Sequence, residues 1–218
     1  GPRVISEKFI RQYVPLPRSD PHTRKTLRNI CCNHKIDHSY SPFIVAQTEE
    51  AIKKASSSTA TGPDGLTSVH LKHLGPAGLA FLTAIFNLSV KEATVPAIWK
   101  SALVLPILKP GKPPGVGSSY RPISLISPVI KILERLLLPT ITASFKTSPT
   151  QHGFRPFRST TTALLPLVNK ISEGFNCKNP ADRTVIVALD LSKAFDMVDL
   201  TLLLDQISTT NLHPNLVR

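Results

Sequence analysis

The stretch TVIVALDLSKAFD, residues 184–196, decides the expected fold of this chain. Its first six residues, Thr184–Leu189, are mostly β-branched and nearly all apolar, which is typical of a strand buried on both faces of a sheet. Asp190 follows at the carboxyl end of this strand. Because α/β proteins bind ligands beyond the carboxyl ends of their strands, the position predicts a carboxylate that faces a ligand.

Asp190 has the chemistry of a metal ligand. Its carboxylate suits Mg²⁺, and the backbone just beyond it can offer a carbonyl oxygen. A structural explanation also fits, because Asp190 or Ser192 can cap the turn after the strand. The spacing alone leaves both explanations open.

The rest of the chain predicts helices and a second strand. Pro76 opens an expected helix that ends before Pro96. Ala102–Leu108 predicts a strand whose Pro106 favours an edge position or a bulge. Further helices are expected from a Thr48 cap to Lys54, across Leu66–Leu74, from Pro128 to Leu138 with Pro139 closing it, from Ser159 or Thr160 with a bend at Pro166, and across Leu200–Ile207. Residues 1–45 predict an extended lead-in with at most one short helix near Arg24–Cys31. The fold class is therefore α+β.

Positive charge is concentrated in the middle of the chain. The 218 residues include 26 Lys and Arg against 14 Asp and Glu, a formal net charge of +12. Residues 100–170 hold ten basic residues and one acidic residue, whereas residues 171–218 carry a net charge of −2. A basic surface attracts phosphate, and carboxylates beside it can hold divalent cations. The alternative is a basic face that is merely solvated.

Composition excludes several classes of protein. A hydrophobic fraction of 41% argues against disorder of the whole chain, and no run of 18 apolar residues could span a membrane. Three cysteines exclude a disulfide scaffold and favour a reducing compartment. The only methionine is Met197, so a chain that starts at Gly1 is expected to be a piece of a longer protein.

Two loops combine residues that suit phosphate or nucleic acid. Lys109 and Arg121 flank a loop rich in Gly and Pro, where they can bind phosphate oxygens; an exposed basic hairpin is the alternative. The stretch 151–160 mixes Phe, Gly and Arg, which suits contact with a nucleic acid strand, although an ordinary helix start also explains it. The residues around Cys31–His38 match no standard zinc site, and Trp99 is expected to anchor the core.

Seven blocks in a fixed order resemble the amino-terminal part of the reverse transcriptase of a non-LTR retrotransposon, from about residue 48 onward. They are ATGPDG at 60–65, IWK at 98–100, PILKPGK at 106–112, YRPISL at 120–125, KILER at 131–135, QHGFR at 151–155 and VALDLSKAFD at 187–196. The resemblance implies the fingers and the start of the palm of a right-hand polymerase. Residues 1–47 would be a lead-in segment, 48–180 the fingers, and 181–218 the first part of the palm.

The resemblance also implies roles for individual residues. Asp190 would be the first catalytic carboxylate and, with the Leu191 carbonyl, a ligand of Mg²⁺. Leu191 and Phe195 would contact the incoming dNTP, with Phe195 as the aromatic gate that excludes a 2′-hydroxyl. Lys109 and Arg121 would hold the triphosphate. The residues that line the template entrance would be Gln151, Gly153, Phe154 and Arg155. The implied partners are an RNA template and a DNA primer, in an intracellular ribonucleoprotein of the nucleus or cytoplasm that is not secreted.

One departure from the family pattern limits the expected activity. The paired aspartates of a Tyr-x-Asp-Asp hairpin are absent, and one carboxylate cannot hold two Mg²⁺ ions in productive geometry. We therefore expect a fragment that is inactive alone and extends no primer. The strand Thr184–Leu189 would present an unpaired edge that favours aggregation. A non-catalytic basic module that binds RNA or DNA is the alternative, and a basic scaffold for protein interactions is a third.

Overall fold

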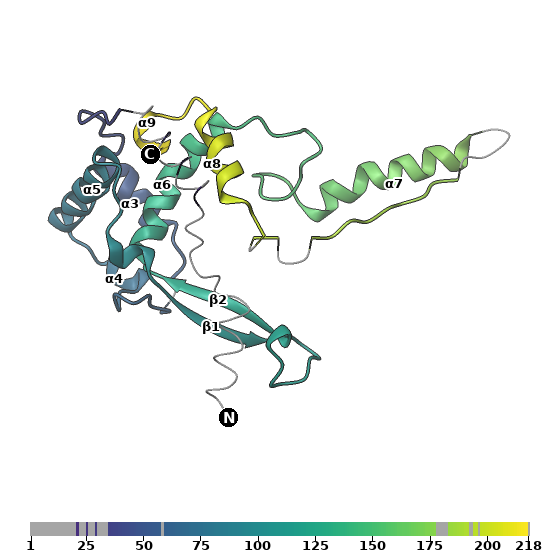
Figure 1. The fold of residues 1–218 in the computed structure, drawn as a ribbon, viewed down its shortest axis with the longest axis horizontal. Helices are drawn as coiled ribbons and strands as arrows, with labels where there is room; N and C mark the ends of the chain where they lie inside the picture. Colours follow the sequence, from purple (N-terminus) through teal and green to yellow (C-terminus); the bar gives the residue numbers. More distant parts are fainter. Residues whose placement is uncertain are drawn as a thin grey trace. The chain divides into compact units, whose positions relative to one another are not determined.

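The computed structural model describes residues 21, 25, 29, 35–57, 59–177, 183–191, 194–195 and 197–217 (Figure 1). The chain divides into unit 1, Gly1–Ser144 with Phe195–Arg218, and unit 2, Phe145–Ala194. Helices and a small antiparallel sheet confirm the mixed α and β character. The boundaries of fingers and palm stay predictions. The helix expected near residues 24–31 lies largely outside the described residues.

Helices build the core of unit 1. They are α3 (Val45–Lys53), α4 (Ser68–Lys72), α5 (Pro76–Lys91) and α6 (Pro128–Ser144). Phe86 on α5 is fully buried, and its ring meets that of Trp99 edge to face at a centroid distance of 6.0 Å. Trp99, in the short 3-10 helix η1 (Ala97–Lys100), thus packs against the core as predicted. The other buried side chains of this core are Phe43, Ala51, Ile52, Leu71, Leu82, Val90, Val129, Ile132 and Leu133.

Thr48 lies inside α3, so its predicted role as a helix cap is wrong. The helix starts at Val45, and the side chain of Gln47 accepts the N–H of Ile44 at 3.0 Å. Thr48 is completely buried, and the hydroxyl of Thr83 on α5 donates to its hydroxyl at 2.8 Å. The hydroxyl group therefore joins two helices, which the local sequence does not indicate.

Pro139 and Pro166 lie in the interior of helices, beyond the first turn. The prediction that Pro139 ends α6 is wrong, because the helix continues to Ser144. α7 (Thr160–Asn176) starts at the predicted Ser159 cap and contains Pro166. Both prolines are exposed, so water can satisfy the carbonyl that loses its N–H partner. Within the described ranges, no helix has the length and apolar character that a membrane crossing needs.

The two strands form a hairpin. β1 (Ala102–Leu108) has the predicted bounds and pairs antiparallel with β2 (Tyr120–Ile126), which follows the 3-10 helix η2 (Gly117–Ser119). Pro106 lies opposite Pro122, so the two missing N–H groups fall on one rung of the ladder. In a two-stranded sheet both strands are edges, where proline is tolerated.

A glycine packs closely against the base of this hairpin. Gly62 starts a turn in which the N–H of Gly65 donates to the Gly62 carbonyl at 3.1 Å. A Cβ atom on Gly62 would lie 2.5 Å from the backbone nitrogen of Ser127 and 2.7 Å from the carbonyl carbon of Ile126. The turn therefore rests directly on the backbone that joins β2 to α6.

Residues 183–191 form no strand, so the prediction of a buried strand over Thr184–Leu189 is wrong. The side chain of Val185 is 83% exposed and that of Leu189 is 92% exposed. A strand needs a neighbour that supplies hydrogen-bond donors and acceptors, and the described part of the chain contains only the β1–β2 sheet. Asp190 consequently lies at the end of an exposed, unpaired segment.

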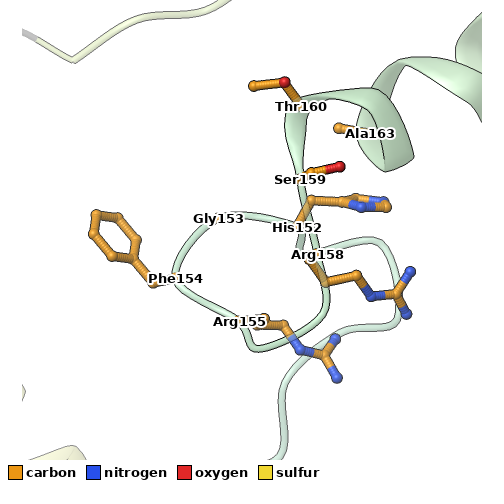
Figure 2. A pocket seen from close by; sticks show the side chains of 8 residues that line it. All are labelled: His152, Gly153, Phe154, Arg155, Arg158, Ser159, Thr160 and Ala163. Carbon is orange, nitrogen blue, oxygen red and sulfur yellow. The ribbon is translucent and has the colours of Figure 1, made fainter. Parts of the chain in front are cut away.

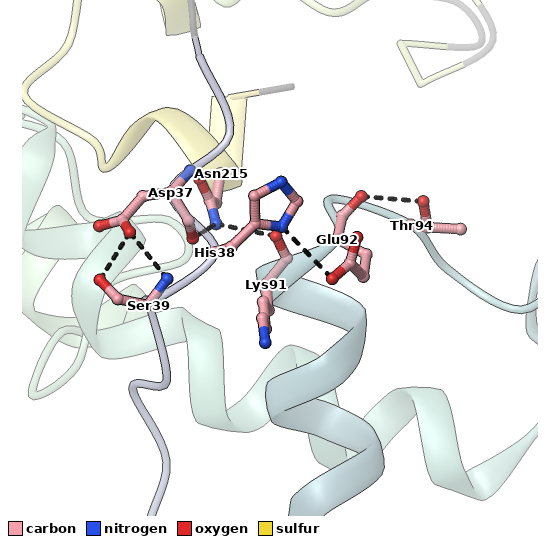
Figure 3. A network of polar contacts seen from close by, with 7 residues as sticks. All are labelled: Asp37, His38, Ser39, Lys91, Glu92, Thr94 and Asn215. Atoms are coloured by element: carbon pink, nitrogen blue, oxygen red, sulfur yellow. Dashed lines mark hydrogen bonds and ion pairs between the residues drawn. The ribbon is translucent and has the colours of Figure 1, made fainter.

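The last helices belong to unit 1. α8 (Leu200–Ser208) confirms the predicted helix there, and the short α9 (Pro214–Val217) follows. The buried side chain of Asn215 accepts the N–H of Asp37 at 2.8 Å and donates to the carbonyls of Asp37 at 2.8 Å and Lys91 at 3.1 Å (Figure 3). These contacts join the start of the described chain to α5 and α9.

Candidate functional site

The β1–β2 hairpin brings together two predicted nucleotide-binding residues. Arg121 lies opposite Ile107, and the N–H of Lys109 donates to the Ser119 carbonyl at 2.8 Å, which continues the ladder by one rung. Alternate rungs of an antiparallel ladder share a face, so Lys109 and Arg121 project from the same face as diagonal neighbours. Two positive charges on one face suit the oxygens of a phosphate group.

The two cations are held differently. The ammonium group of Lys109 donates to the Ser118 carbonyl at 2.8 Å, across the loop of the hairpin. The side chain of Arg121 is exposed and has no hydrogen-bond or ion-pair partner among the residues that the structure describes. Arg121 can therefore meet a ligand without losing a contact, whereas Lys109 must first leave a backbone carbonyl.

The loop before α7 is braced by its own polar side chains. The guanidinium of Arg155 donates to the Ser148 carbonyl at 2.9 Å and to the Gln151 carbonyl at 3.4 Å. The side-chain amide of Gln151 donates to the Gly153 carbonyl at 3.1 Å. Two of the four residues predicted to bind nucleic acid, Gln151 and Arg155, therefore also shape the loop.

A cavity of about 370 Å³ lies between this loop and the start of α7 (Figure 2). Its lining contains two guanidinium groups, from Arg155 and Arg158, and no carboxylate. Both guanidinium groups extend in a similar direction in Figure 2, while the imidazole of His152 lies 3.0 Å from the Thr162 hydroxyl. The other lining residues are Gly153, Phe154, Ser159, Thr160 and Ala163. The cavity is suited to an anionic ligand.

Phe154 and Gly153 could each contribute to a nucleic acid contact, Phe154 through its exposed ring and Gly153 through its lack of a side chain. The Phe154 side chain is 96% exposed, and its ring points away from the loop in Figure 2. A Cβ atom on Gly153 would meet only the side-chain amide of Gln151, at an ordinary 3.5 Å. The fold itself therefore does not require glycine at this position, although a closely approaching ligand would.

The resemblance did not assign Phe157 and Arg158, which the structure places beside the predicted residues. Phe157 is fully exposed, and Arg158 lines the cavity. A signal for them was present in the sequence, since the dipeptide Phe-Arg occurs at 154–155 and again at 157–158. The resemblance covered only the first copy.

The three remaining predicted site residues are exposed. Asp190 and Leu191 lie in unit 2, and Leu191 is 78% exposed. Phe195, which is 82% exposed, lies in unit 1 together with Lys109 and Arg121. Ser192, Lys193 and Asp196 lie outside the described residues. A cavity that Asp190 shares with Lys109 and Arg121 stays a prediction.

The donors at Asp190 suit part of a magnesium site. Mg²⁺ binds through one or two carboxylates together with water and substrate phosphates, so the carboxylate of Asp190 and the carbonyl of Leu191 have the right chemistry. No group of three His, Cys, Asp or Glu residues gathers within the part of the chain that the structure describes. The ligand set visible here is therefore incomplete.

Most of the residues considered for zinc lie outside the part of the chain that the structure describes. Cys31, Cys32 and His34 lie outside the described residues. His38 is placed with its Nδ1 atom 3.4 Å from a carboxylate oxygen of Glu92, in an exposed pair (Figure 3).

Comparisons with known proteins agree on one family. Residues 107–218 match the family described as reverse transcriptase (RNA-dependent DNA polymerase). A probable RNA-directed DNA polymerase from transposon X-element of Drosophila melanogaster is 32% identical over 168 residues, which are 75% of this chain and 18% of that protein. The corresponding protein of transposon BS is 35% identical over 161 residues, and that of the mobile element jockey of Drosophila funebris is 33% identical over 161 residues. Each of these two alignments covers 72% of this chain and 17% of the relative. The chain therefore spans less than a fifth of the length of the curated relatives that it matches.

Proposed function

The chain belongs to the reverse transcriptase family, of the kind found in non-LTR retrotransposons, and on that premise we propose that it takes part in RNA-directed DNA synthesis within an intracellular ribonucleoprotein. One observation carries the proposal. Every residue singled out for chemistry, from Lys109 to Phe195, falls within the matched span 107–218. The relatives are named as RNA-directed DNA polymerases of transposons, which is the activity proposed for the whole protein.

The hairpin carries the residues that we propose bind the incoming nucleotide. Lys109 and Arg121 share a face, so both can contact the triphosphate of a dNTP. Phosphoryl transfer depends mainly on positioning and charge stabilisation, and these two cations provide both for the leaving pyrophosphate. Phe195 would lie under the sugar and exclude a 2′-hydroxyl by its ring.

The loop before α7 is the proposed contact with template and primer. Gln151 and Arg155 hold its shape, Gly153 leaves room for close approach, and Phe154 presents an exposed ring. Bases stack on such rings, whereas the guanidinium groups of the cavity meet phosphates.

The exposed Asp190 is the proposed metal ligand in this chain. The carboxylate of Asp190 and the carbonyl of Leu191 would hold Mg²⁺, which in such sites activates the primer hydroxyl and offsets the charge of the leaving pyrophosphate. The two residues supply only part of a two-metal ligand set, so we expect the 218-residue chain alone to extend no primer.

Photocrosslinking tests these assignments in the chain itself. A labelled dNTP is crosslinked to the 218-residue protein in the presence of an RNA template, a DNA primer and Mg²⁺. Arg121→Ala and Asp190→Asn should each reduce labelling severalfold, whereas Asp205→Asn, an exposed carboxylate on α8, should not. Equal labelling of the Asp190 and Asp205 variants would remove Asp190 from the site.

A second function is favoured by a specific observation. Asp190 lies on an exposed segment outside any sheet, and no group of three metal-binding residues gathers in the described ranges. A basic module that binds RNA or DNA without catalysis needs neither feature. Such a module should bind with a steep dependence on salt and should not respond to Mg²⁺ or to Asp190→Asn.

A further inference from the structure

The loop before α7 contains the dipeptide Phe-Arg twice. Phe154-Arg155 and Phe157-Arg158 are separated only by Pro156. An aromatic ring beside a guanidinium group suits single-stranded nucleic acid, because the ring stacks on a base and the guanidinium binds a phosphate. The repeat gives the loop two such pairs within residues 154–158.

Both phenylalanines adopt a backbone conformation that is unfavourable for bulky residues. The φ angle is 58° at Phe154 and 60° at Phe157, in the left-handed region. The side chain of Phe157 is 101% exposed, so burial within the described chain does not offset this cost. A ring held outward under strain indicates a ligand that the ring meets.

The two arginines serve different purposes. Arg155 donates to the carbonyls of Ser148 and Gln151 and so braces the loop. Arg158 lines the same cavity (Figure 2) and has no hydrogen-bond or ion-pair partner in the described part of the chain. Arg158 is therefore the guanidinium that can bind a phosphate without giving up an existing contact.

The charge of the surrounding sequence favours a polyanion as the ligand. Between Glu134 and Glu173 the chain contains five Lys or Arg residues and no Asp or Glu. An apolar protein surface would also cover an exposed phenylalanine, but it gains nothing from this excess of positive charge. A nucleic acid strand is attracted by the charge and offers base faces to the rings.

We infer that Phe157 and Arg158 form a second nucleotide-binding unit beside Phe154 and Arg155. The loop thus holds two successive nucleotides of a single strand, one at each Phe-Arg pair. This inference rests on the proposed function, in which the same loop contacts the template. It adds two binding residues and a preference for unpaired bases.

Fluorescence anisotropy with the 218-residue chain tests the inference. The probe is a labelled single-stranded RNA of about ten nucleotides, with a duplex of the same sequence for comparison. Phe157→Ala should weaken binding of the single strand about tenfold and of the duplex far less. Phe157→Trp should retain binding because the ring can still stack, whereas Phe157→Gly, which relieves the backbone strain, should bind as weakly as Phe157→Ala. Phe175→Ala, a 70% exposed ring in unit 2, is the matched control and should bind like the wild type.

The salt dependence separates the ring from the charge. Arg158→Ala should lower the slope of log affinity against log salt by about 0.7, while Phe157→Ala should leave that slope unchanged. Circular dichroism confirms that each variant is folded.

The outcomes distinguish this inference from the proposed function. If Phe154→Ala weakens binding and Phe157→Ala does not, the second unit is wrong and the template contact stands. If neither substitution changes binding, the loop is not a nucleic acid surface and the proposed template contact fails with it. Loss of binding in Phe157→Gly but not in Phe157→Ala would mean that backbone shape, not stacking, matters, and would overturn the inference.

Discussion

Two apolar runs of this chain have a similar composition and different structures. Ala102–Leu108 is strand β1, whereas Thr184–Leu189 forms no strand and has no strand partner among the described residues. β1 meets β2 across the loop 109–119, which keeps the entropic cost of closure small. An apolar run alone therefore does not make a strand, because pairing depends on a second segment that supplies hydrogen-bond partners.

Separation along the sequence does not by itself prevent a contact in this chain. Asn215 bonds to Asp37 although the two residues are 178 positions apart. Asn215 makes three hydrogen bonds at a buried site, so each of the polar groups that it meets is satisfied. The apolar side chains from Val185 to Leu189 have no such polar partner, and all of residues 183–191 are exposed.

The largest effect on stability is expected from a substitution at the base of the hairpin. Gly62→Ala places a methyl group 2.5 Å from the backbone nitrogen of Ser127, and the backbone on either side must move. We expect a loss of about 3 kcal/mol in the free energy of unfolding, measured by urea denaturation. Gly75→Ala is the steric control, since its Cβ would have no atom within 4 Å; as a change at the N-cap of α5 it should cost no more than about 1 kcal/mol. Equal stability of the two variants would show that the turn does not support the hairpin.

The next effect tests the long-range contact. Asn215→Ala leaves the N–H and carbonyl of Asp37 and the carbonyl of Lys91 without the side chain that they bond. The expected loss is about 2 kcal/mol in the free energy of unfolding. Asn211→Ala, at an exposed position, should cost less than about 0.5 kcal/mol in the same measurement.

A lysine substitution in each of the two apolar runs tests whether only the first run is paired. Leu105→Lys removes a cross-strand pair with Ile123 and should cost up to about 1 kcal/mol. Val187→Lys, at a side chain that is 76% exposed, should change the free energy of unfolding by less than about 0.5 kcal/mol and should reduce aggregation measured by light scattering. A large loss of stability in Val187→Lys would show that residues 183–191 are paired in solution.

The smallest expected effect is a dependence on pH near the long-range contact. Hydrogen bonds from the hydroxyl and the N–H of Ser39, with His213 nearby, hold the pKa of Asp37 below its usual 3.8. A lowered pKa means that the folded state favours the carboxylate. The stabilisation is therefore complete above pH 3.8 and disappears as the pH falls through the lower pKa of the folded state.

Asp37→Asn should flatten this part of the curve of urea midpoint against pH. Ser39→Ala removes the hydroxyl that bonds the carboxylate and should flatten the curve in part. An unchanged curve in Asp37→Asn would assign the acid sensitivity to other groups.

Local signals in the sequence predicted much of the fold. Pro76 at the first position of α5, the Ser159 cap of α7 and the bounds of β1 act within a few residues of chain, and each is seen in the structure. The errors arise where burial or exposure in the folded chain decides. Thr48 is buried against α5, and Pro139 is tolerated inside α6 because its position is exposed to water.

For the candidate site too, the sequence indicated the residues and the structure showed how they are arranged. The sequence was sufficient to single out Lys109 and Arg121, because their blocks resemble those of a known family. That both residues share one face depends on the register of the hairpin. Likewise, the amino-acid sequence of the loop does not indicate that the guanidinium of Arg155 donates to backbone carbonyls while that of Arg158 does not.

The sequence by itself determined the family, the excess of positive charge and the helices and strand whose signals lie within one turn or one hairpin. Charge and local propensity are properties of neighbouring residues, so they can be read without a fold. Only the tertiary structure decided which apolar run became a strand, which prolines a helix accepts and which arginine of the loop is available. These outcomes depend on burial and on hydrogen-bond partners that come from elsewhere in the chain.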